Sequence, residues 1–371
     1  MQHRPEIDGL RAFAVLPVMF FHAGFAWVGG GFIGVDIFFV ISGFLITSIV
    51  QREVTEKRFT LVGFYERRAR RIFPALFTII LICFPFAWWL MDATQLRAFG
   101  KSAIAASVFL ANFYFAGAAN YFEPSAELMP LLHTWSLSVE EQFYVFFPIL
   151  LLALSFLGIT HTRNIVIILG LLALGAFSLT IFMAKVNPTL NFYWPVSRAW
   201  ELLAGAIAAF VYTRPSEKSK VQECVAALGF VMLIGGLLFL RAEMENRFAY
   251  SIFPVIGTVL VLVTADGRTL TGRFFDVAAF RGCWLDQLQR LSASSTHIRI
   301  CALLFGERPI IVDCLRFVDC DAGWGLPVLA FGGGADQKQK GVVLPISQYA
   351  FCCVCLFYLS VQHRGIRHHE I

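Results

Sequence analysis

The feature that most constrains this chain is a series of apolar runs, each long enough to cross a lipid bilayer. Hydrophobic residues make up 58% of the 371 residues and charged residues only 15%, whereas a soluble domain carries about 25% charged residues. A bilayer core needs roughly 20 mainly apolar residues per helix, and lipid forces the backbone of such a run to satisfy its own hydrogen bonds. The sequence therefore predicts an all-α, polytopic transmembrane bundle with about eight to ten spans.

Eight spans can be placed from these runs. They are expected near 9–27, 31–50, 72–91, 143–160, 164–184, 199–212, 224–240 and 248–265. Basic residues favour the cytoplasmic side of a membrane, and loop 51–71 carries seven of them, so we expect this loop and the N-terminus in the cytoplasm. The same rule disfavours 103–119 as a ninth span, because crossing there would place the later basic loops outside. We expect 92–142 to be an extracytoplasmic segment with a helix that lies on, or partly enters, the membrane.

Several classes of protein are disfavoured by what the sequence lacks. It contains no P-loop, no GxGxxG motif and no zinc-ligand spacing, so no metal is expected. The first apolar run is too long for a cleavable signal peptide, and no A-x-A site follows it. The net charge of +5 comes from basic residues beside the spans, which is a membrane-orientation pattern and predicts no nucleic-acid partner.

Two ionisable residues, Arg11 and His22, lie in the first span. They are eleven residues apart, so they project from one helix face within about 20° and lie roughly 16 Å apart along the axis. An ionisable group inside a span is costly unless it faces a polar interior, and it is therefore a functional candidate. The alternative is a histidine that only bonds to a neighbouring helix.

Asp36 follows the hairpin Gly29-Gly30-Gly31 by five residues, and His22 precedes that hairpin by a similar distance. Matched depth on adjacent antiparallel helices makes a hydrogen bond between His22 and Asp36 possible, and a carboxylate partner would raise the basicity of the imidazole. The alternative is that Asp36 merely caps its helix. The next polar pair, Ser42-Gly43, is more typical of close helix packing than of chemistry.

Two polar constellations lie outside the first hairpin. In the segment before the fourth span, Ser138 and Glu141 have the spacing of a capping box, whereas Glu140, His133 and Trp135 could bind a hydroxyl-rich acceptor. Further on, Arg198 and Glu201 lie three residues apart on one helix face, which favours a structural ion pair.

An arginine cluster precedes the third span. It consists of Arg67, Arg68, Arg70 and Arg71. Such a cluster is usually an orientation signal and an anchor for anionic lipid, but four arginines in five residues could equally bind a phosphate-rich ligand such as coenzyme A.

Five ordered motifs resemble the acyltransferase-3 family, the membrane O-acyltransferases of bacterial surface polysaccharides. The resemblance covers roughly 4–265 and rests on 4–12 (RPEIDGLRA) with His22, 34–47 (GVDIFFVISGFLIT), 67–74 (RRARRIFP), 135–144 (WSLSVEEQFY) and 198–201 (RAWE). It implies a multi-pass protein of the bacterial inner membrane that transfers an acyl group, commonly acetyl, from cytoplasmic acyl-CoA to a hydroxyl of an extracytoplasmic glycan such as lipopolysaccharide.

The resemblance also implies roles for the polar residues. Arg11 and His22 correspond to the residues most closely tied to activity in the family, with His22 as general base or as covalent acyl carrier. Arg11 and the arginine cluster would hold the donor phosphates. Asp36 and Glu140 complete the expected catalytic set, and the acceptor would be bound by His133, Trp135, Arg198 and Glu201. The donor acyl-CoA is a substrate, and no bound cofactor is expected.

The pattern of the family fails after about Arg281. We therefore expect an acyltransferase-like domain over 1–281 and a divergent tail over 282–371, with one possible span at 341–361. Seven of the nine cysteines lie in that tail, and this change of composition suggests a tail translated out of the ancestral frame, with genuine divergence as the alternative. We do not expect the soluble esterase-like domain that some relatives append.

Two other functions compete with the enzyme. A membrane exporter of a small acidic or acylated metabolite would also bury Arg, His and Asp within its spans, although no inverted repeat is visible. An inactive relic of the acyltransferase is favoured only by the aberrant tail. The acyl chain, the acceptor sugar and the oligomeric state cannot be inferred from this sequence.

Overall fold

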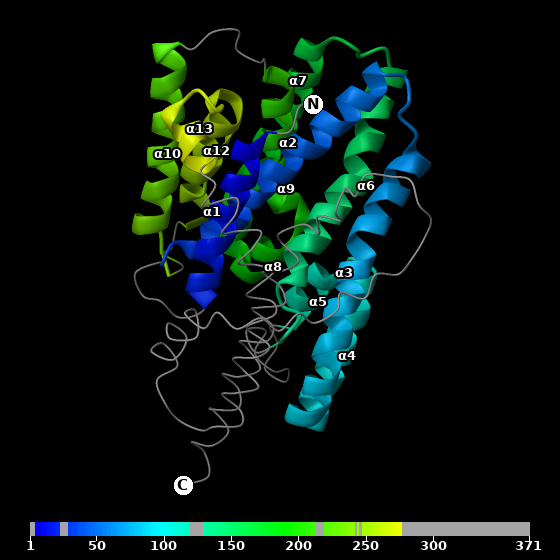
Figure 1. The fold of residues 1–371 in the computed structure, drawn as a ribbon. Helices are drawn as coiled ribbons and strands as arrows, with labels where there is room; N and C mark the ends of the chain where they lie inside the picture. Colours follow the sequence, from blue (N-terminus) through cyan, green and yellow to red (C-terminus); the bar gives the residue numbers. More distant parts are fainter. Residues whose placement is uncertain are drawn as a thin grey trace, which may run out of the picture.

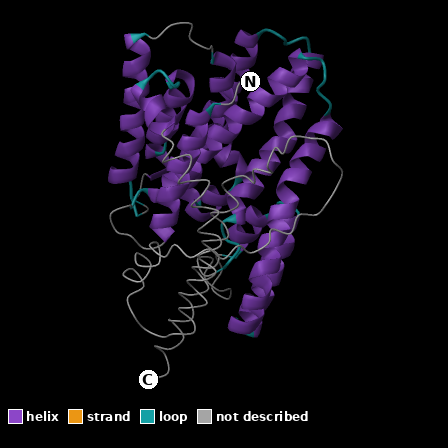
Figure 2. Cartoon of the chain, in the orientation of Figure 1, coloured by secondary structure: helices purple, strands orange, loops and turns teal. Residues whose placement is uncertain are grey.

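The computed structural model describes residues 4–22, 29–118, 129–212, 219–241, 243–244 and 247–276, and within these ranges the chain is helical without a strand (Figures 1 and 2). The helices are α1 (Pro5–His22), the 3-10 helix η2 (Gly31–Ile33), α2 (Gly34–Thr55), α3 (Leu61–Leu90), α4 (Ala93–Ser107), α5 (Ala111–Gly117), α6 (Thr134–Phe156), α7 (Thr162–Val186), α8 (Pro188–Tyr193), α9 (Pro195–Val211), α10 (Lys220–Phe239), α11 (Arg247–Tyr250), α12 (Ile252–Thr264) and α13 (Leu270–Asp276).

Each of the eight expected spans overlaps a helix, although residues 23–27 of the first lie outside the described residues, and the helical bundle confirms an all-α, multi-pass membrane protein. Six helical segments of the described chain are long and apolar enough to cross a bilayer, namely 31–55, 61–90, 134–156, 162–186, 220–239 and 247–264. The other two expected spans fall short of this measure for visible reasons. Helix α1 carries three charged residues among its 18, and α9 has only 17 residues.

The stretch 103–119 is divided between two short helices and does not form a ninth span. Helix α4 ends at Ser107 and α5 begins at Ala111. Between them, Phe109 stacks on Phe73 of α3 with ring centroids 5.4 Å apart, while Phe99 of α4 packs in one cluster with Cys83 of α3. Helix α4 therefore runs back along α3, and their hairpin projects beyond the neighbouring helices at the end away from the N-terminus (Figure 1).

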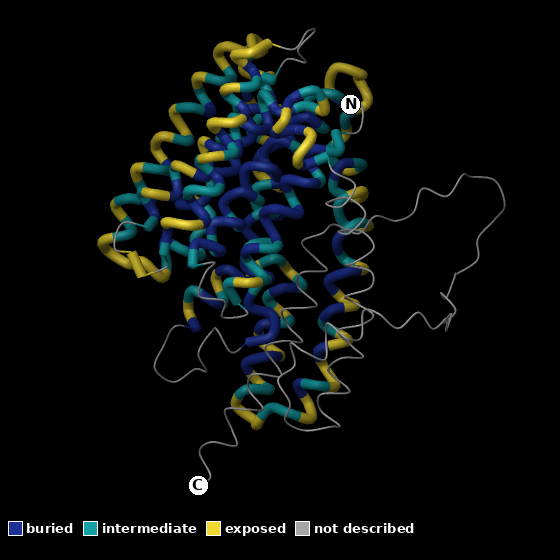
Figure 3. The backbone as a smooth tube through the Cα atoms, turned by 60° about the vertical axis from the view of Figure 1, so that its left-hand side comes forward, coloured by how far each residue is buried: buried dark blue, intermediate teal, exposed yellow. Residues whose placement is uncertain are grey.

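Buried residues gather in the middle of the bundle (Figure 3), and α2 and α9 supply many of them. A Cβ atom at Gly43 would lie 1.9 Å from the carbonyl oxygen of Leu202, and one at Gly205 would lie 1.9 Å from the carbonyl oxygen of Val40. Only glycine allows two helix backbones to approach this closely. The prediction that Gly43 marks close helix packing is therefore confirmed.

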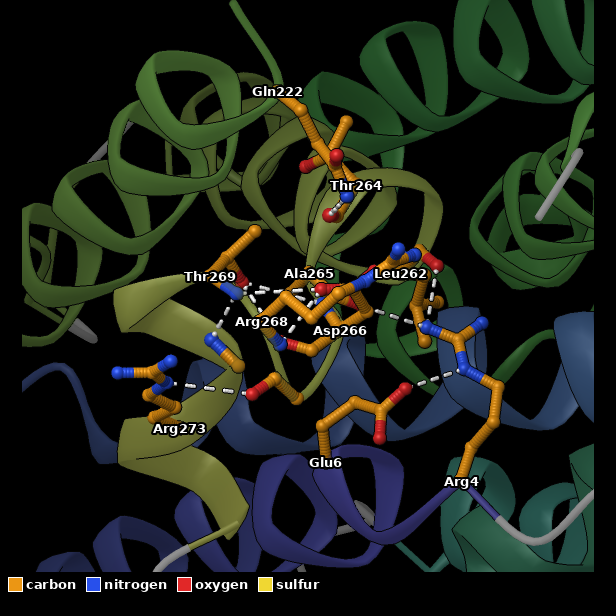
Figure 4. Close-up of polar contacts among 12 residues, drawn as sticks. Arg4, Glu6, Gln222, Leu262, Thr264, Ala265, Asp266, Arg268, Thr269 and Arg273 are labelled. Atoms are coloured by element: carbon orange, nitrogen blue, oxygen red, sulfur yellow. Dashed lines mark hydrogen bonds and ion pairs between the residues drawn. The ribbon is translucent and has the colours of Figure 1, made fainter. Parts of the chain in front are cut away.

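The start of α1 is tied to the end of α12 by Arg4 (Figure 4). The Nη2 atom of Arg4 donates to the carbonyl oxygens of Leu262 and Ala265, both at 3.0 Å, and Nε donates to Glu6 at 2.6 Å. A helix C-terminus leaves carbonyl groups without partners, and a guanidinium satisfies them while complementing the helix dipole. This contact fixes the position from which α1 carries Arg11 and His22.

The tail predictions concern residues that the structure does not describe. The boundary at 281, the possible span at 341–361 and the cysteines after Arg281 all lie beyond the last described residue, Asp276.

Candidate functional site

His22 lies in the last turn of α1, and its ring is held by its own helix. The Nδ1 atom lies 2.8 Å from the carbonyl oxygen of Val18. A carbonyl can only accept a hydrogen bond, so Nδ1 carries the proton in this contact. The neutral ring then has Nε2 as its basic nitrogen, which is the atom that could take a proton or attack a carbonyl carbon.

A second imidazole, that of His133, meets His22 from the start of α6. The two ring centroids are 4.5 Å apart and the ring planes are nearly perpendicular, at 86°. His133 is the N-cap residue of α6. Burial lowers its pKa well below the ordinary value, and the nearby His22 lowers it further. The structure therefore brings together two residues that the sequence had assigned to separate roles, and His133 is a neutral imidazole at ordinary pH.

Asp36 does not have the partner that was expected. Its carboxylate accepts a hydrogen bond from Nη2 of Arg198 at 2.8 Å, so the pairing with His22 is wrong, and so is the capping alternative. A buried carboxylate gains more from a guanidinium than from a neutral imidazole, because the charge-assisted bond offsets its lost hydration. The matched depth of two helices was too coarse a guide to find this partner.

The ion pair between Arg198 and Glu201 is confirmed, with Nη1 to Oε1 at 2.7 Å. Arg198, Asp36 and Glu201 have side chains at most 4% exposed, and we call them the Arg198 cluster. Its guanidinium also lies over three aromatic rings, at 5.4 to 5.8 Å from the centroids of Phe39, Trp135 and Phe192. This arginine therefore joins α2, α6, α8 and α9.

Trp135 was expected to stack on a sugar, but its neighbours are protein side chains. The residue is 4% exposed, and its ring centroid lies 4.6 Å from that of Phe192. Trp135 and the Arg198 cluster are thus built into the core beside the histidine pair, where they can support the site rather than contact a ligand in this arrangement.

The arginine cluster of α3 divides into two pairs with different surroundings. Arg67 bonds to both carboxylate oxygens of Glu53, at 2.7 and 2.6 Å, and Arg70 pairs with Glu66 at 2.6 Å. The side chains of Arg67 and Arg70 are 55% and 79% exposed. Residues three apart share a helix face, so Arg68 and Arg71 form the other pair, and both are half-buried.

Arg68 and Arg71 face the first helix and α6. The guanidinium of Arg68 lies over the ring of Tyr144, 5.0 Å from its centroid. Arg71 lies close enough to Arg68, Arg11, Tyr144 and Glu140 for their charges to act on it. Among the described residues, no carboxylate forms an ion pair with Arg68 or Arg71. Three guanidinium groups, which we call the arginine group (Arg11, Arg68 and Arg71), therefore share one region.

Glu140 lies at the arginine group. Its Oε2 atom accepts a hydrogen bond from the Tyr144 hydroxyl at 3.1 Å. Ser42 of α2 lies beside this carboxylate, and the charges of Arg11 and Arg68 act on it. The structure thus places Glu140 with the group at the Arg11 end of α1, whereas His133, seven residues earlier, meets His22.

The capping-box interpretation of Ser138 and Glu141 is wrong, because α6 begins at Thr134. The Ser138 hydroxyl instead donates to the carbonyl of Thr134 at 2.9 Å and accepts from the amide of Ala111 at 3.2 Å. Glu141 is 8% exposed, and its Oε1 atom has no hydrogen-bond partner among the described residues.

The sequence interpretation missed Ser42 and Tyr144 as members of the site, and also Glu141, on which the charges of Arg68 and Arg71 act. Tyr144 could have been found from its spacing, because it follows Glu140 by four residues on the same helix face. Ser42 could not have been found in this way, because Ser42 and Glu140 lie on two helices that are far apart in the sequence. Within the described residues, no group of three His, Cys, Asp or Glu side chains could hold a metal ion.

Comparisons with known proteins identify the family. Residues 4–298 match the acyltransferase-3 family, whose description is an acyltransferase domain. The SAS0844 protein of Staphylococcus aureus (strain MSSA476), a candidate O-acetyltransferase by name, is 34% identical over 261 residues, which are 67% of this chain and 42% of that protein. No solved structure matches the chain.

Two further relatives carry more specific names. The peptidoglycan O-acetyltransferase OatA of Listeria monocytogenes is 31% identical over 291 residues, covering 75% of this chain and 46% of the relative. The O-acetyltransferase OatA of Staphylococcus aureus (strain NCTC 8325) is 34% identical over 277 residues, covering 71% and 45%. The chain thus spans less than half the length of these relatives, and the family match covers most of the chain: it belongs to the acyltransferase-3 family of membrane acyltransferase domains.

Proposed function

We propose that this protein transfers an acyl group, most simply acetyl, from cytoplasmic acyl-CoA to a hydroxyl of an extracytoplasmic glycan. The glycan would be a cell-surface or lipid-linked polysaccharide, and the protein would lie in the bacterial cytoplasmic membrane with its N-terminus inside. Family membership supports the transferase chemistry. The names of both OatA relatives support acetyl as the group, and the name of the Listeria relative supports a cell-wall glycan as the kind of acceptor.

The single observation that carries the proposal is the polarity of α1. One end of its polar face meets the arginine group, where the charges of Arg11, Arg68 and Arg71 converge. The other end carries His22 against His133. The two ends are roughly 16 Å apart along the helix. Phosphates bound at the arginines would leave an extended pantetheine arm free to run along α1 and present its thioester to His22.

The chemistry at His22 follows from its tautomer. With Nδ1–H donated to Val18, Nε2 takes the proton of the acceptor hydroxyl as the hydroxyl oxygen attacks the thioester carbonyl carbon. The tetrahedral intermediate collapses, the carbon–sulfur bond breaks, and the thiolate of coenzyme A takes up the proton that Nε2 carried. The alternative is a relay in which Nε2 attacks the thioester and releases the thiolate; the acyl group then passes from Nε2 to the hydroxyl oxygen, and the hydroxyl proton goes to the thiolate.

Of the remaining predicted residues, some would contact the donor and the others would hold the site in position. Glu140, bonded to Tyr144, would keep the arginine group in place before the donor phosphates arrive. Arg67 and Arg70 have acidic partners on the exposed side, so we assign donor binding to Arg68 and Arg71 together with Arg11. The Arg198 cluster and Trp135 would fix the start of α6, and with it the position of His133.

The test is transfer of radiolabelled acetyl from acetyl-CoA to surface glycan in membranes that contain the full chain. We expect His22→Ala to abolish transfer, whichever of the two mechanisms operates, because both use Nε2. Phe20→Ala is the matched control, since Phe20 lies two residues away on α1 and is 37% exposed; we expect it to retain transfer. Equal label from His22→Ala and the unaltered protein would refute the proposal, and label from neither would refute it for this chain.

A further inference from the structure

His133 enters the site on a rigid support. It precedes α6 in a tight turn, where the Thr134 hydroxyl donates to the carbonyl of Leu131 at 2.7 Å and the Ser136 hydroxyl donates to the carbonyl of His133 at 3.1 Å. Two residues later, Trp135 is fixed under the guanidinium of Arg198. The backbone of His133 is therefore held from both sides, and its ring is a fixed surface for whatever packs on it.

His22 lies at the very end of its helix. It is the last residue of α1, and its Nδ1 bonds to the carbonyl oxygen of Val18. A half-turn of the ring about χ2 would exchange Nδ1 with a carbon atom and break that bond. The perpendicular contact with His133, with centroids 4.5 Å apart, aims the edge of one ring at the face of the other, a geometry that aromatic rings prefer.

We propose that His133 is the positioning residue of His22: its ring holds the His22 imidazole in the one orientation that keeps Nδ1–H on the Val18 carbonyl and turns Nε2 toward the acceptor hydroxyl. The catalytic part of this inference rests on the proposed function. The structural part, the orientation of the His22 ring, does not.

The electrostatics of the pair agree with this role. His22 gains a positive charge when Nε2 takes the hydroxyl proton, and a second imidazolium 4.5 Å away would oppose that step. Burial keeps His133 neutral, as its lowered pKa indicates. A neutral ring can brace His22 without repelling its proton, which a lysine or arginine at this position could not do.

The first test uses steady-state transfer kinetics to separate positioning of His22 by His133 from a contribution of His133 to acetyl-CoA binding. We expect His133→Ala to lower kcat about 3- to 10-fold, the factor that corresponds to losing one aromatic pair, with the KM for acetyl-CoA unchanged within about twofold because the arginine group is remote. His133→Phe restores the perpendicular ring and should recover most of the lost kcat. An unchanged kcat in His133→Ala, or a His133→Phe variant as slow as His133→Ala, would overturn the proposal.

The second test needs no turnover. Nitrogen-15 chemical shifts of ring-labelled histidine, assigned with His22→Gln, report which nitrogen of His22 carries the proton. We expect a single Nδ1–H tautomer in the unaltered protein and in His133→Phe, and a mixture of both tautomers in His133→Ala. A single unchanged tautomer in His133→Ala would overturn the inference. A tautomer mixture in that variant, found in a protein that transfers no acetyl, would uphold the positioning of His22 and refute only the proposed function.

Discussion

Arginines occupy two regions of this molecule in opposite ways. At Arg198, both terminal nitrogens bond to buried carboxylates and three aromatic rings surround the guanidinium. At Arg68 and Arg71, no carboxylate forms an ion pair within the described chain, although Glu140 and its hydroxyl partners lie nearby. In the first region the guanidinium and the carboxylates are bonded to one another, whereas in the second Arg68 and Arg71 lie near the carboxyl groups of Glu140 and Glu141 without an ion pair among the described residues.

This difference separates an arginine that builds the fold from arginines that can bind a ligand. A guanidinium whose donors are already taken by buried acids has little to offer a phosphate, and removing it leaves those acids without a counter-charge. Half-buried guanidinium groups that share a region without ion pairs repel one another, and an incoming polyanion relieves that repulsion. Residue type alone would have placed Arg198 and Arg68 in the same class.

The largest expected effect comes from breaking the Arg198 cluster. Arg198→Met leaves Asp36 and Glu201 buried without a cation, which should destabilise the fold by roughly 3–5 kcal/mol. The measurement is the thermal midpoint and the monodisperse yield of the detergent-solubilised protein. A variant as stable as the unaltered protein would show that Arg198 is not structural.

Its control is the triple variant Asp36→Asn, Arg198→Met and Glu201→Gln, which removes all three charges together. Because replacing a whole buried charge cluster is often neutral, this variant should recover most of the lost stability. If the triple variant remains as unstable as Arg198→Met, then the Arg198 cluster stabilises the fold through the geometry of its hydrogen bonds and not through charge balance.

The next effect is on ligand binding at the arginine group. We expect Arg68→Gln and Arg71→Gln each to weaken acetyl-CoA binding about 10- to 100-fold, the value of a hydrogen bond to a charged group, and to leave the thermal midpoint nearly unchanged. Binding of radiolabelled acetyl-CoA to membranes measures the loss. Unaltered affinity in both variants would place the donor phosphates elsewhere.

The smallest effect is expected at the outward pair on the same helix. Arg67→Gln should cost about 1 kcal/mol of stability, since Glu53 is mostly buried, and Arg70→Gln only a few tenths, since its pair is exposed. Acetyl-CoA affinity should stay within about twofold in both. A loss of affinity as large as that of Arg68→Gln would erase the distinction between the two pairs of α3.

The span positions and the fold class were predictable because a bilayer imposes helix length and composition on every crossing segment. Local spacing also identified the ion pair of Arg198 with Glu201 and the common face of Arg11 and His22. Both depend only on the helical repeat, which the sequence displays directly.

The partners of Asp36 and His22, namely Arg198 and His133, could not be predicted from the sequence, because each lies more than 100 residues away along the chain. Matched depth suggested that the two would bond to each other, but depth does not specify rotation about the helix axis, and Asp36 faces α9 while His22 faces the start of α6. The spacing of the α3 arginines predicts two pairs, because residues three apart share a helix face. It does not predict which of the two pairs faces the interior of the bundle.

The glycine contacts at Gly43 and Gly205 have a mechanical consequence. With carbonyl oxygens already occupying the places where side chains would start, α2 and α9 cannot slide or rotate past each other without a steric collision. The two helices therefore behave as one rigid unit. In addition, the hydrogen bonds from Arg4 tie the start of α1 to the end of α12. An exporter that alternates access needs one half of the protein to rock against the other. The close packing of α2 against α9 opposes any such motion between these two helices. A transferase has no such requirement, because its donor and acceptor can each reach the site from one side of the membrane.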